Sequence, residues 1–102
     1  ALVLAEKAGI DLERAYDVLQ ASAAGAPYVT YKRAAFLDPE NSPVAFTLAL
    51  VAKDQGLIEQ LATEVDTTMV LGDAARQLVA DAVEAGLGER DMAAIAEHIR
   101  RT

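Results

Sequence analysis

Apolar residues return along most of this chain at intervals of three and four positions, the spacing that places them on one side of an α-helix. The pattern predicts helices over residues 1–8, 12–24, 27–36, 50–63, 68–85 and 91–101. The core-facing stripes are Leu12, Ala15, Tyr16 and Leu19 in the second helix, Leu71, Ala75, Leu78 and Ala82 in the fifth, and Met92, Ile95, Ala96 and Ile99 in the last. No pair of alternating strands interrupts them, so the sequence predicts an all-α fold, a compact bundle of five to six helices.

The predicted helices are separated by residues that favour caps and turns. Gly9 is suited to close the first helix in a left-handed conformation, and Asp11 to cap the start of the second with its carboxylate. Residues 38–43, DPENSP, form the clearest loop in the sequence. Thr67 or Thr68 is expected to cap the helix that follows it.

The stretch FTLALVAKDQGL places two charged residues inside an apolar run. Phe46, Leu48 and Leu50 alternate, which predicts an extended lead-in to a helix. From Leu50 onward the spacing is helical and puts Lys53 and Asp54 on or beside the apolar side, near the helix start. Burying a charge is costly unless it is paired or used, so these two residues are the main candidates for function.

Simpler interpretations of these residues stay open from the pattern alone. Lys53 can lay its aliphatic stem on apolar surface and keep its ammonium in water. Asp54 can be a first-turn residue favoured by the positive end of the helix dipole. Phe46, taken by itself, is typical of a core residue.

Other polar clusters support weaker interpretations. Tyr28 and Tyr31, with the neighbouring residues Lys32-Arg33, either line the mouth of a pocket or belong to a partly buried helix. The run Glu89-Arg90-Asp91 is typical of solvated surface charge, and His98 of an exposed position on the last helix.

Composition excludes several classes of function. Sixteen acidic against nine basic residues give a net charge of −7, which argues against a nucleic-acid surface. The chain has no cysteine and one histidine, so neither a cysteine-based zinc site nor a His-pair metal motif is expected. No apolar run approaches the roughly 20 residues that span a bilayer. We therefore expect no metal and no membrane, and the lack of cysteine fits a cytoplasmic protein.

Several motifs together resemble the β-hydroxyacid dehydrogenases, the family of 3-hydroxyisobutyrate dehydrogenase and tartronate semialdehyde reductase. The run F-x-L-x-L-x-x-K-D resembles a signature of this family, and the opening ALVLAEKAGID resembles the end of its interdomain helix. Ser42-Pro43 before the run and the late G-x-G-x-x-D of Gly86, Gly88 and Asp91 match in order and spacing. The resemblance covers the whole chain. It implies that residues 1–102 are a single C-terminal helical domain, like that of the 6-phosphogluconate dehydrogenase-like enzymes.

The resemblance also implies roles for particular residues. Lys53 and Phe46 would contact the nicotinamide end of NAD or NADP, and Asp54 would support the pocket. The family's catalytic lysine lies upstream on the interdomain helix, so no catalytic residue is expected in this chain. The dinucleotide-binding Rossmann domain is likewise absent, because no G-x-G-x-x-G follows a strand. We expect the chain to be one domain of a longer protein.

The resemblance implies an NAD(P)-dependent enzyme that transfers hydride to or from a small 3-hydroxy acid. This chain would be its substrate and dimerisation domain, inactive alone, with no cofactor bound to it. Its expected partners are the Rossmann domain and a second copy of the enzyme. The alternative is a non-enzymatic, acidic helical module that only associates with partners or with itself.

Overall fold

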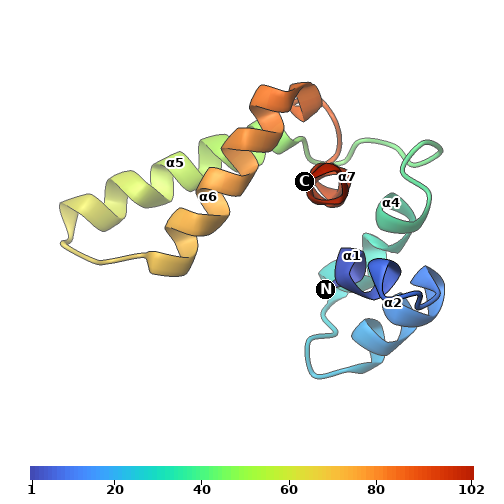
Figure 1. The fold of residues 1–102 in the computed structure, drawn as a ribbon. Helices are drawn as coiled ribbons and strands as arrows, with labels where there is room; N and C mark the ends of the chain where they lie inside the picture. Colours follow the sequence, from blue (N-terminus) through green and yellow to red (C-terminus); the bar gives the residue numbers. More distant parts are fainter.

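The computed structural model describes all 102 residues and consists of helices and the segments that connect them (Figure 1). The elements are α1 Leu2–Lys7, α2 Leu12–Ala21, α3 Pro27–Tyr31, α4 Arg33–Leu37, α5 Leu48–Glu64, α6 Val70–Ala82, η1 Val83–Leu87, η2 Met92–Ala94 and α7 Ile95–Arg101. Here η1 is a kinked turn, because Gly86 within it has a non-helical φ of +91°, and η2 is a 3₁₀ turn. The predicted all-α fold is confirmed, and the third predicted helix is divided into α3 and α4. No helix combines the length and apolarity needed to cross a membrane.

Two groups of helices lie on either side of α7 (Figure 1). On one side α5 and α6 pack against each other and project as a hairpin, which we call the arm (residues 48–82). On the other side α1 to α4 form what we call the N-terminal lobe (residues 2–37). The first and last helices are neighbours, because α1 packs on α7 and Arg100 forms a 2.6 Å ion pair with Glu6.

The ends of the first two helices follow the sequence prediction. Gly9 follows α1 with a φ of +78°, a left-handed conformation that favours glycine. The Asp11 carboxylate accepts a hydrogen bond of 3.0 Å from the backbone N–H of Arg14 and so caps α2. Both signals are local, and neither needs any contact with the rest of the chain.

The predicted cap of α6 is wrong. That helix begins at Val70, and the residue before it, Met69, offers no side-chain acceptor. Thr67 instead belongs to the end of α5, where its backbone N–H donates to the carbonyl oxygen of Ala62 at 2.8 Å. Asp66, directly before Thr67, has a φ of +53° and is the left-handed residue that ends α5.

The core is small and lies at the base of the arm. Five buried residues form its central cluster: Leu48, Val79, Ala82, Leu87 and Ala94. They come from α5, α6 and the two short turns, so the core fixes the start of α5 against residues 87–94. Only 11 of the 102 residues are buried, which leaves much apolar surface uncovered by this chain.

The predicted apolar stripe of α6 is buried at only one end. Ala82 is fully buried at the base of the arm and Leu78 is half-buried, as the pattern predicts. Leu71, at the other end, is 86% exposed, and Ala75 is also exposed, so the prediction of a core face fails for these two residues. The reason is position, because the tip of the arm extends away from every helix except α5 (Figure 1).

Candidate functional site

Lys53 and Asp54 lie in the second turn of α5 and form an ion pair, with 2.8 Å between Lys53 Nζ and Asp54 Oδ1. The two side chains are 59% and 48% exposed. An ion pair this open to water contributes about 0–1 kcal/mol to stability, because the solvent screens both charges. The fold of this chain therefore does not depend on the pair.

The pair lies beside an apolar stripe that faces away from the core. Leu50, Leu57 and Leu61 share this side of α5 at helical spacing, and all three are exposed. Leu48, on the opposite side of the helix, is fully buried. The sequence predicts the stripe correctly, but nothing in this chain covers it. Helix α5 therefore has two apolar sides, of which only one packs within the chain.

The structure argues against the simpler interpretation of Asp54 and is compatible with that of Lys53. Helix α5 begins at Leu48, so Asp54 is its seventh residue and lies beyond the first turn. The helix dipole acts mainly within the first turn, so it gives no reason for an acid at this position. Lys53 does keep its ammonium in water, as the snorkelling interpretation expects. That interpretation and a ligand contact are both compatible with its position.

Phe46 precedes α5 in a bend and is 37% exposed. Only Thr47 is extended, whereas Leu48 and Leu50 are already helical, so the predicted extended lead-in is wrong beyond Thr47. The backbone of Phe46 is fixed on both sides. The N–H donates to Asp91 Oδ2 at 3.3 Å, and the carbonyl oxygen accepts from the N–H of Met92 at 2.8 Å. Seven residues separate Phe46 from Lys53, roughly 10 Å along a helix axis, and no hydrogen bond or ion pair joins them. Phe46 lies just before α5 and Lys53 in its second turn, so the two side chains would contact a ligand at different points.

Asp91 and Lys32 form a buried ion pair that the sequence interpretation misses. Lys32 Nζ lies 2.8 Å from Oδ1 and 2.7 Å from Oδ2 of Asp91, and the side chains are 4% and 12% exposed. The prediction that Asp91 is solvated surface charge is therefore wrong. The late G-x-G-x-x-D motif was the one available signal that this aspartate differs from its charged neighbours.

The environment of Asp91 stabilises its charged form. Burial alone would raise the pKa of this carboxyl group. Hydrogen bonds from Lys32 and from the backbone N–H groups of Ala93, Ala45 and Phe46 outweigh burial, and they lower the pKa from 3.8 to about 2. The carboxylate is therefore ionised at any physiological pH and holds its partners as a permanent anion.

We expect acid to weaken the fold through this group. The folded state has the lower pKa, so the stabilisation from Asp91 is present above about pH 4 and is lost as the pH falls towards 2. The free energy of unfolding should fall by roughly 2 kcal/mol across that range. Urea unfolding, followed by helical circular dichroism at several pH values, measures it. In Asp91→Asn the fall in the free energy of unfolding between about pH 4 and pH 2 should be smaller by roughly 2 kcal/mol, and an unchanged fall would contradict the assignment.

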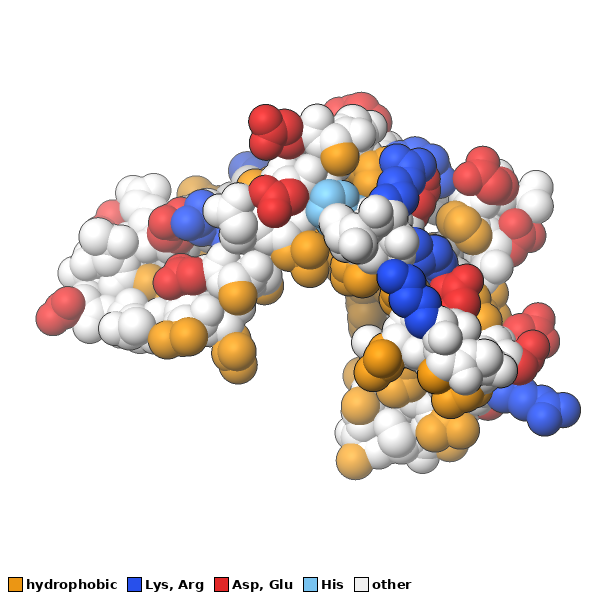
Figure 2. Space-filling model, in the orientation of Figure 1, with side chains coloured by type: hydrophobic (Ala, Val, Ile, Leu, Met, Phe, Trp, Pro, Cys, Tyr) orange, Lys and Arg blue, Asp and Glu red, His pale blue; other side chains and the backbone are white.

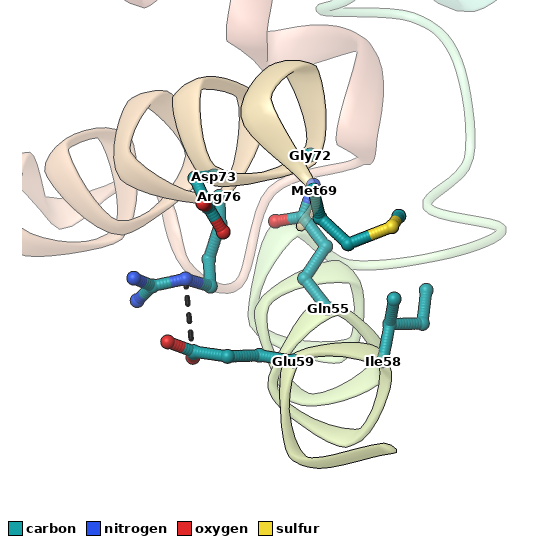
Figure 3. A pocket seen from close by; sticks show the side chains of 7 residues that line it. All are labelled: Gln55, Ile58, Glu59, Met69, Gly72, Asp73 and Arg76. Atoms are coloured by element: carbon teal, nitrogen blue, oxygen red, sulfur yellow. Dashed lines mark ion pairs between the residues drawn. The ribbon is translucent and has the colours of Figure 1, made fainter. Parts of the chain in front are cut away.

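A small pocket of about 120 Å³ lies between the two helices of the arm (Figure 3). It is lined by Gln55, Ile58, Glu59, Met69, Gly72, Asp73 and Arg76. Arg76 and Glu59 form an ion pair of 3.1 Å across it without a well-aligned hydrogen bond, and Gln55 Oε1 is buried without a partner. The pocket has no hydroxyl, thiol, lysine or histidine side chain, and the structure has no group of three or more acidic or imidazole side chains that could hold a metal. It can admit water to satisfy Gln55, but it offers no reactive arrangement.

The aromatic cluster near Lys32 belongs to a partly buried helix. Tyr28 and Tyr31 pack edge to face with ring centroids 5.6 Å apart, and Lys32 is turned inward to Asp91. The Arg33 guanidinium lies 5.3 Å from the ring centroid of Tyr16. Arg33 borders an open surface hollow with Asp17, Gln20 and Ala21, whereas Lys32 is buried and Tyr31 is exposed, so the four residues do not form one pocket mouth.

The surface of the molecule is hollowed between the arm and the N-terminal lobe, and hydrophobic side chains line its edges (Figure 2). Separately, an apolar groove of about 480 Å³ lies among α1, α4 and α7, with Leu2, Phe36 and Ile99 among its lining residues. The exposed stripe of α5 and this groove are both apolar surfaces that another body could cover.

Comparison with known proteins identifies the family to which this chain belongs. Residues 1–99 match the profile of a family described as NAD-binding of NADP-dependent 3-hydroxyisobutyrate dehydrogenase. The chain belongs to the 3-hydroxyisobutyrate dehydrogenase family. It is also 34% identical over 101 residues to the 3-sulfolactaldehyde reductases of Escherichia coli K12 and Shigella flexneri. The match covers 98% of this chain and 34% of each relative, so the chain spans about a third of their length.

Membership of the 3-hydroxyisobutyrate dehydrogenase family confirms the resemblance to β-hydroxyacid dehydrogenases. The description of this family names NAD and NADP, which supports a nicotinamide cofactor for the intact enzymes of this kind. The contacts of Lys53 and Phe46 with that cofactor, and the supporting part of Asp54, stay predictions. Their positions fit it, because a half-exposed ammonium and a partly exposed ring lie along one segment that borders uncovered apolar surface.

Proposed function

We propose that this chain is the helical domain of an NAD(P)-dependent dehydrogenase that transfers hydride between nicotinamide and a small 3-hydroxy acid. The observation that carries the proposal is the Lys53–Asp54 ion pair on the exposed apolar side of α5. The pair contributes little to folding. Its cation is well placed for a surface that closes over an anionic dinucleotide, where a charge-assisted hydrogen bond is strong.

The residues of this chain would bind and orient the cofactor. Lys53 has three N–H donors, and its only protein partner is Asp54, so donors remain for ribose or phosphate oxygens. Asp54 would limit the cost of holding the ammonium once the cleft closes and water leaves. The partly exposed ring of Phe46 would pack beside the nicotinamide.

The chemical step would be completed by groups outside this chain. When bound, the nicotinamide cofactor supplies or accepts the hydride. The proton would move to or from a lysine on the interdomain helix upstream, acting as general acid and base on the hydroxyl or carbonyl oxygen. The helical domain therefore contributes position and affinity, and we expect it to be inactive alone and to hold no cofactor alone.

A turnover assay on two proteins tests this function. The intact protein that contains this domain should oxidise at least one short 3-hydroxy acid, with 3-hydroxyisobutyrate and serine as first candidates. It could equally reduce a short aldehyde such as 3-sulfolactaldehyde, the substrate named for the relatives. Each is assayed with both NAD and NADP couples. The purified 102-residue chain should show no turnover above blank, and clear turnover by it would contradict the assignment of the missing parts.

We expect the isolated chain to form dimers or larger assemblies at micromolar concentration. The reason is the exposed apolar stripe of α5, which would lie against the Rossmann domain or a second copy in the intact enzyme. Sedimentation velocity measures this directly. The double variant Leu57→Glu/Leu61→Glu should sediment as a monomer, whereas Ala23→Glu in the exposed turn after α2 serves as the control and should not. A monomeric parent chain would contradict the prediction.

The alternative is a helical module that only associates with partners. The net charge of −7 and the uncovered apolar surface fit such a module as well. The two functions differ in what they require of Lys53, because an association module has no need of a cation there. The coding sequence upstream of residue 1 separates them cheaply, since a Rossmann fingerprint supports the dehydrogenase and an unrelated domain supports the module.

A further inference from the structure

The carboxylate of Asp91 joins three segments that are distant in the sequence. It binds Lys32 at the junction of α3 and α4 through both oxygens, at 2.8 and 2.7 Å. Oδ2 also accepts from the backbone N–H groups of Ala45 at 3.0 Å and Phe46 at 3.3 Å. Oδ1 accepts from the N–H of Ala93 at 3.0 Å, which caps the turn that carries the aspartate.

Backbone hydrogen bonds extend the same connection on either side. The N–H of Leu48 donates to the carbonyl oxygen of Arg90 at 3.1 Å, and that of Ala49 to Gly88 at 2.9 Å. The N–H of Met92 donates to the carbonyl of Phe46 at 2.8 Å. The position of residues 45–49 is therefore set by residues 88–92, and the Asp91 side chain ties both segments to the N-terminal lobe through Lys32.

We propose that Asp91, held by Lys32, is a positioning residue that sets where Phe46 and the start of α5 lie relative to the bound nicotinamide cofactor. The inference rests on the function proposed above, because it takes Phe46 and Lys53 as cofactor contacts. Asp91 acts only through the lead-in segment. The geometry of Asp91 suits this task, because both of its carboxylate oxygens accept hydrogen bonds and its side chain is only 12% exposed.

A neutral amide at this position would disturb the segment without removing the side chain. Asparagine keeps one acceptor oxygen but replaces the other with an NH₂ donor. In place of Oδ2 that donor would face Lys32 and the N–H groups of Ala45 and Phe46, and in place of Oδ1 it would face Lys32 and the N–H of Ala93, all of which are donors themselves. The lead-in would shift to avoid the clash of donors. A displacement of about 1 Å in a positioning element can lower turnover up to a hundredfold.

The test compares Asp91→Asn, Lys53→Ala and Asp17→Asn in the intact enzyme, at a temperature where all three variants remain folded. Asp17→Asn is the control, because it breaks the 2.8 Å ion pair between Asp17 and Arg33 on the outside of the N-terminal lobe. We expect Asp91→Asn to raise the KM for the cofactor about tenfold and to leave the KM for the hydroxy acid within about twofold. Asp17→Asn should change neither. A loss of stability without a change in the cofactor KM would assign Asp91 a structural role only and overturn the inference.

A second measurement uses the 102-residue chain and needs no cofactor. Amide hydrogen exchange should become at least about tenfold faster at Ala45 and Phe46 in Asp91→Asn, with little change at Leu57 in the arm. Unchanged protection at both amides would overturn the positioning role. If Lys53→Ala leaves cofactor affinity unchanged, the proposed function fails and this inference fails with it. If Lys53→Ala weakens cofactor binding and Asp91→Asn does not, only the inference fails.

Discussion

An Asp91→Ala variant of this chain should lose about 3–5 kcal/mol of stability, the cost of leaving a buried charge without its partner. The loss has two parts. Lys32, which is 4% exposed, would keep a buried ammonium with no acceptor. Three backbone N–H groups, of Ala45, Phe46 and Ala93, would lose theirs as well. Domains are commonly stable by 5–15 kcal/mol, so this one change could unfold a large share of the molecules.

The same geometry predicts an order among related variants. Lys32→Met should cost less than Asp91→Ala, because Asp91 keeps its three N–H donors when the lysine is gone. Guanidinium unfolding followed by circular dichroism gives the ranking. Lys53→Met is the control for removing a lysine from an exposed pair, and its stability should stay within about 1 kcal/mol of the parent. Equal losses for Lys32→Met and Lys53→Met would contradict the view that the Lys32–Asp91 pair is the one that matters for folding.

The largest functional effect is expected from Lys53→Ala in the intact enzyme. Losing a charge-assisted hydrogen bond to the cofactor should cost about 1.5–3 kcal/mol, or roughly ten- to a hundredfold in cofactor-dependent turnover. Thermal stability should change little, because the Lys53–Asp54 pair is more than half open to water on the lysine side. Steady-state kinetics with varied cofactor, together with a thermal melt, measure both quantities.

Asp54→Ala tests the supporting role of Asp54 separately from the contact between Lys53 and the cofactor. It leaves the ammonium of Lys53 in place but removes the only group that pairs with it. We expect a smaller loss of cofactor affinity than for Lys53→Ala, because the hydrogen bond to the cofactor can still form. If Lys53→Ala leaves both rate and cofactor affinity unchanged, Lys53 is a snorkelling surface lysine and has no part in binding.

What could be predicted from the sequence was local in origin. Gly9 and Asp11 end and begin helices through their own conformational and hydrogen-bonding preferences, so position in the chain was enough. Apolar periodicity likewise predicted the all-α fold. The cap at Thr67 failed because two helix ends compete for the same short segment, and the end of α5 uses this residue.

What could not be predicted depends on contacts between distant residues. Lys32 and Asp91 are 59 residues apart, and each is next to an arginine, Arg33 or Arg90, whose side chain is partly exposed. The G-x-G-x-x-D motif sets Asp91 apart but does not point to Lys32, so the burial of the pair became visible only when the lobe and the short turns were placed together. The prediction that Leu71 faces the core was wrong for a related reason. Periodicity shows that a helix has an apolar side, but it does not show whether anything covers that side.

The two apolar sides of α5 have a consequence for how substitutions in this helix would be tolerated. Changes at the side that packs on α6 would be rejected by any selection that requires a folded chain. Changes at Leu57 or Leu61 would pass that selection, because these side chains contact little within the chain. A mutational screen scored on folding would therefore report the exposed side of the helix as neutral. If that side lies against another domain or a second copy, as proposed, only a screen scored on the activity of the intact enzyme would show it to be constrained.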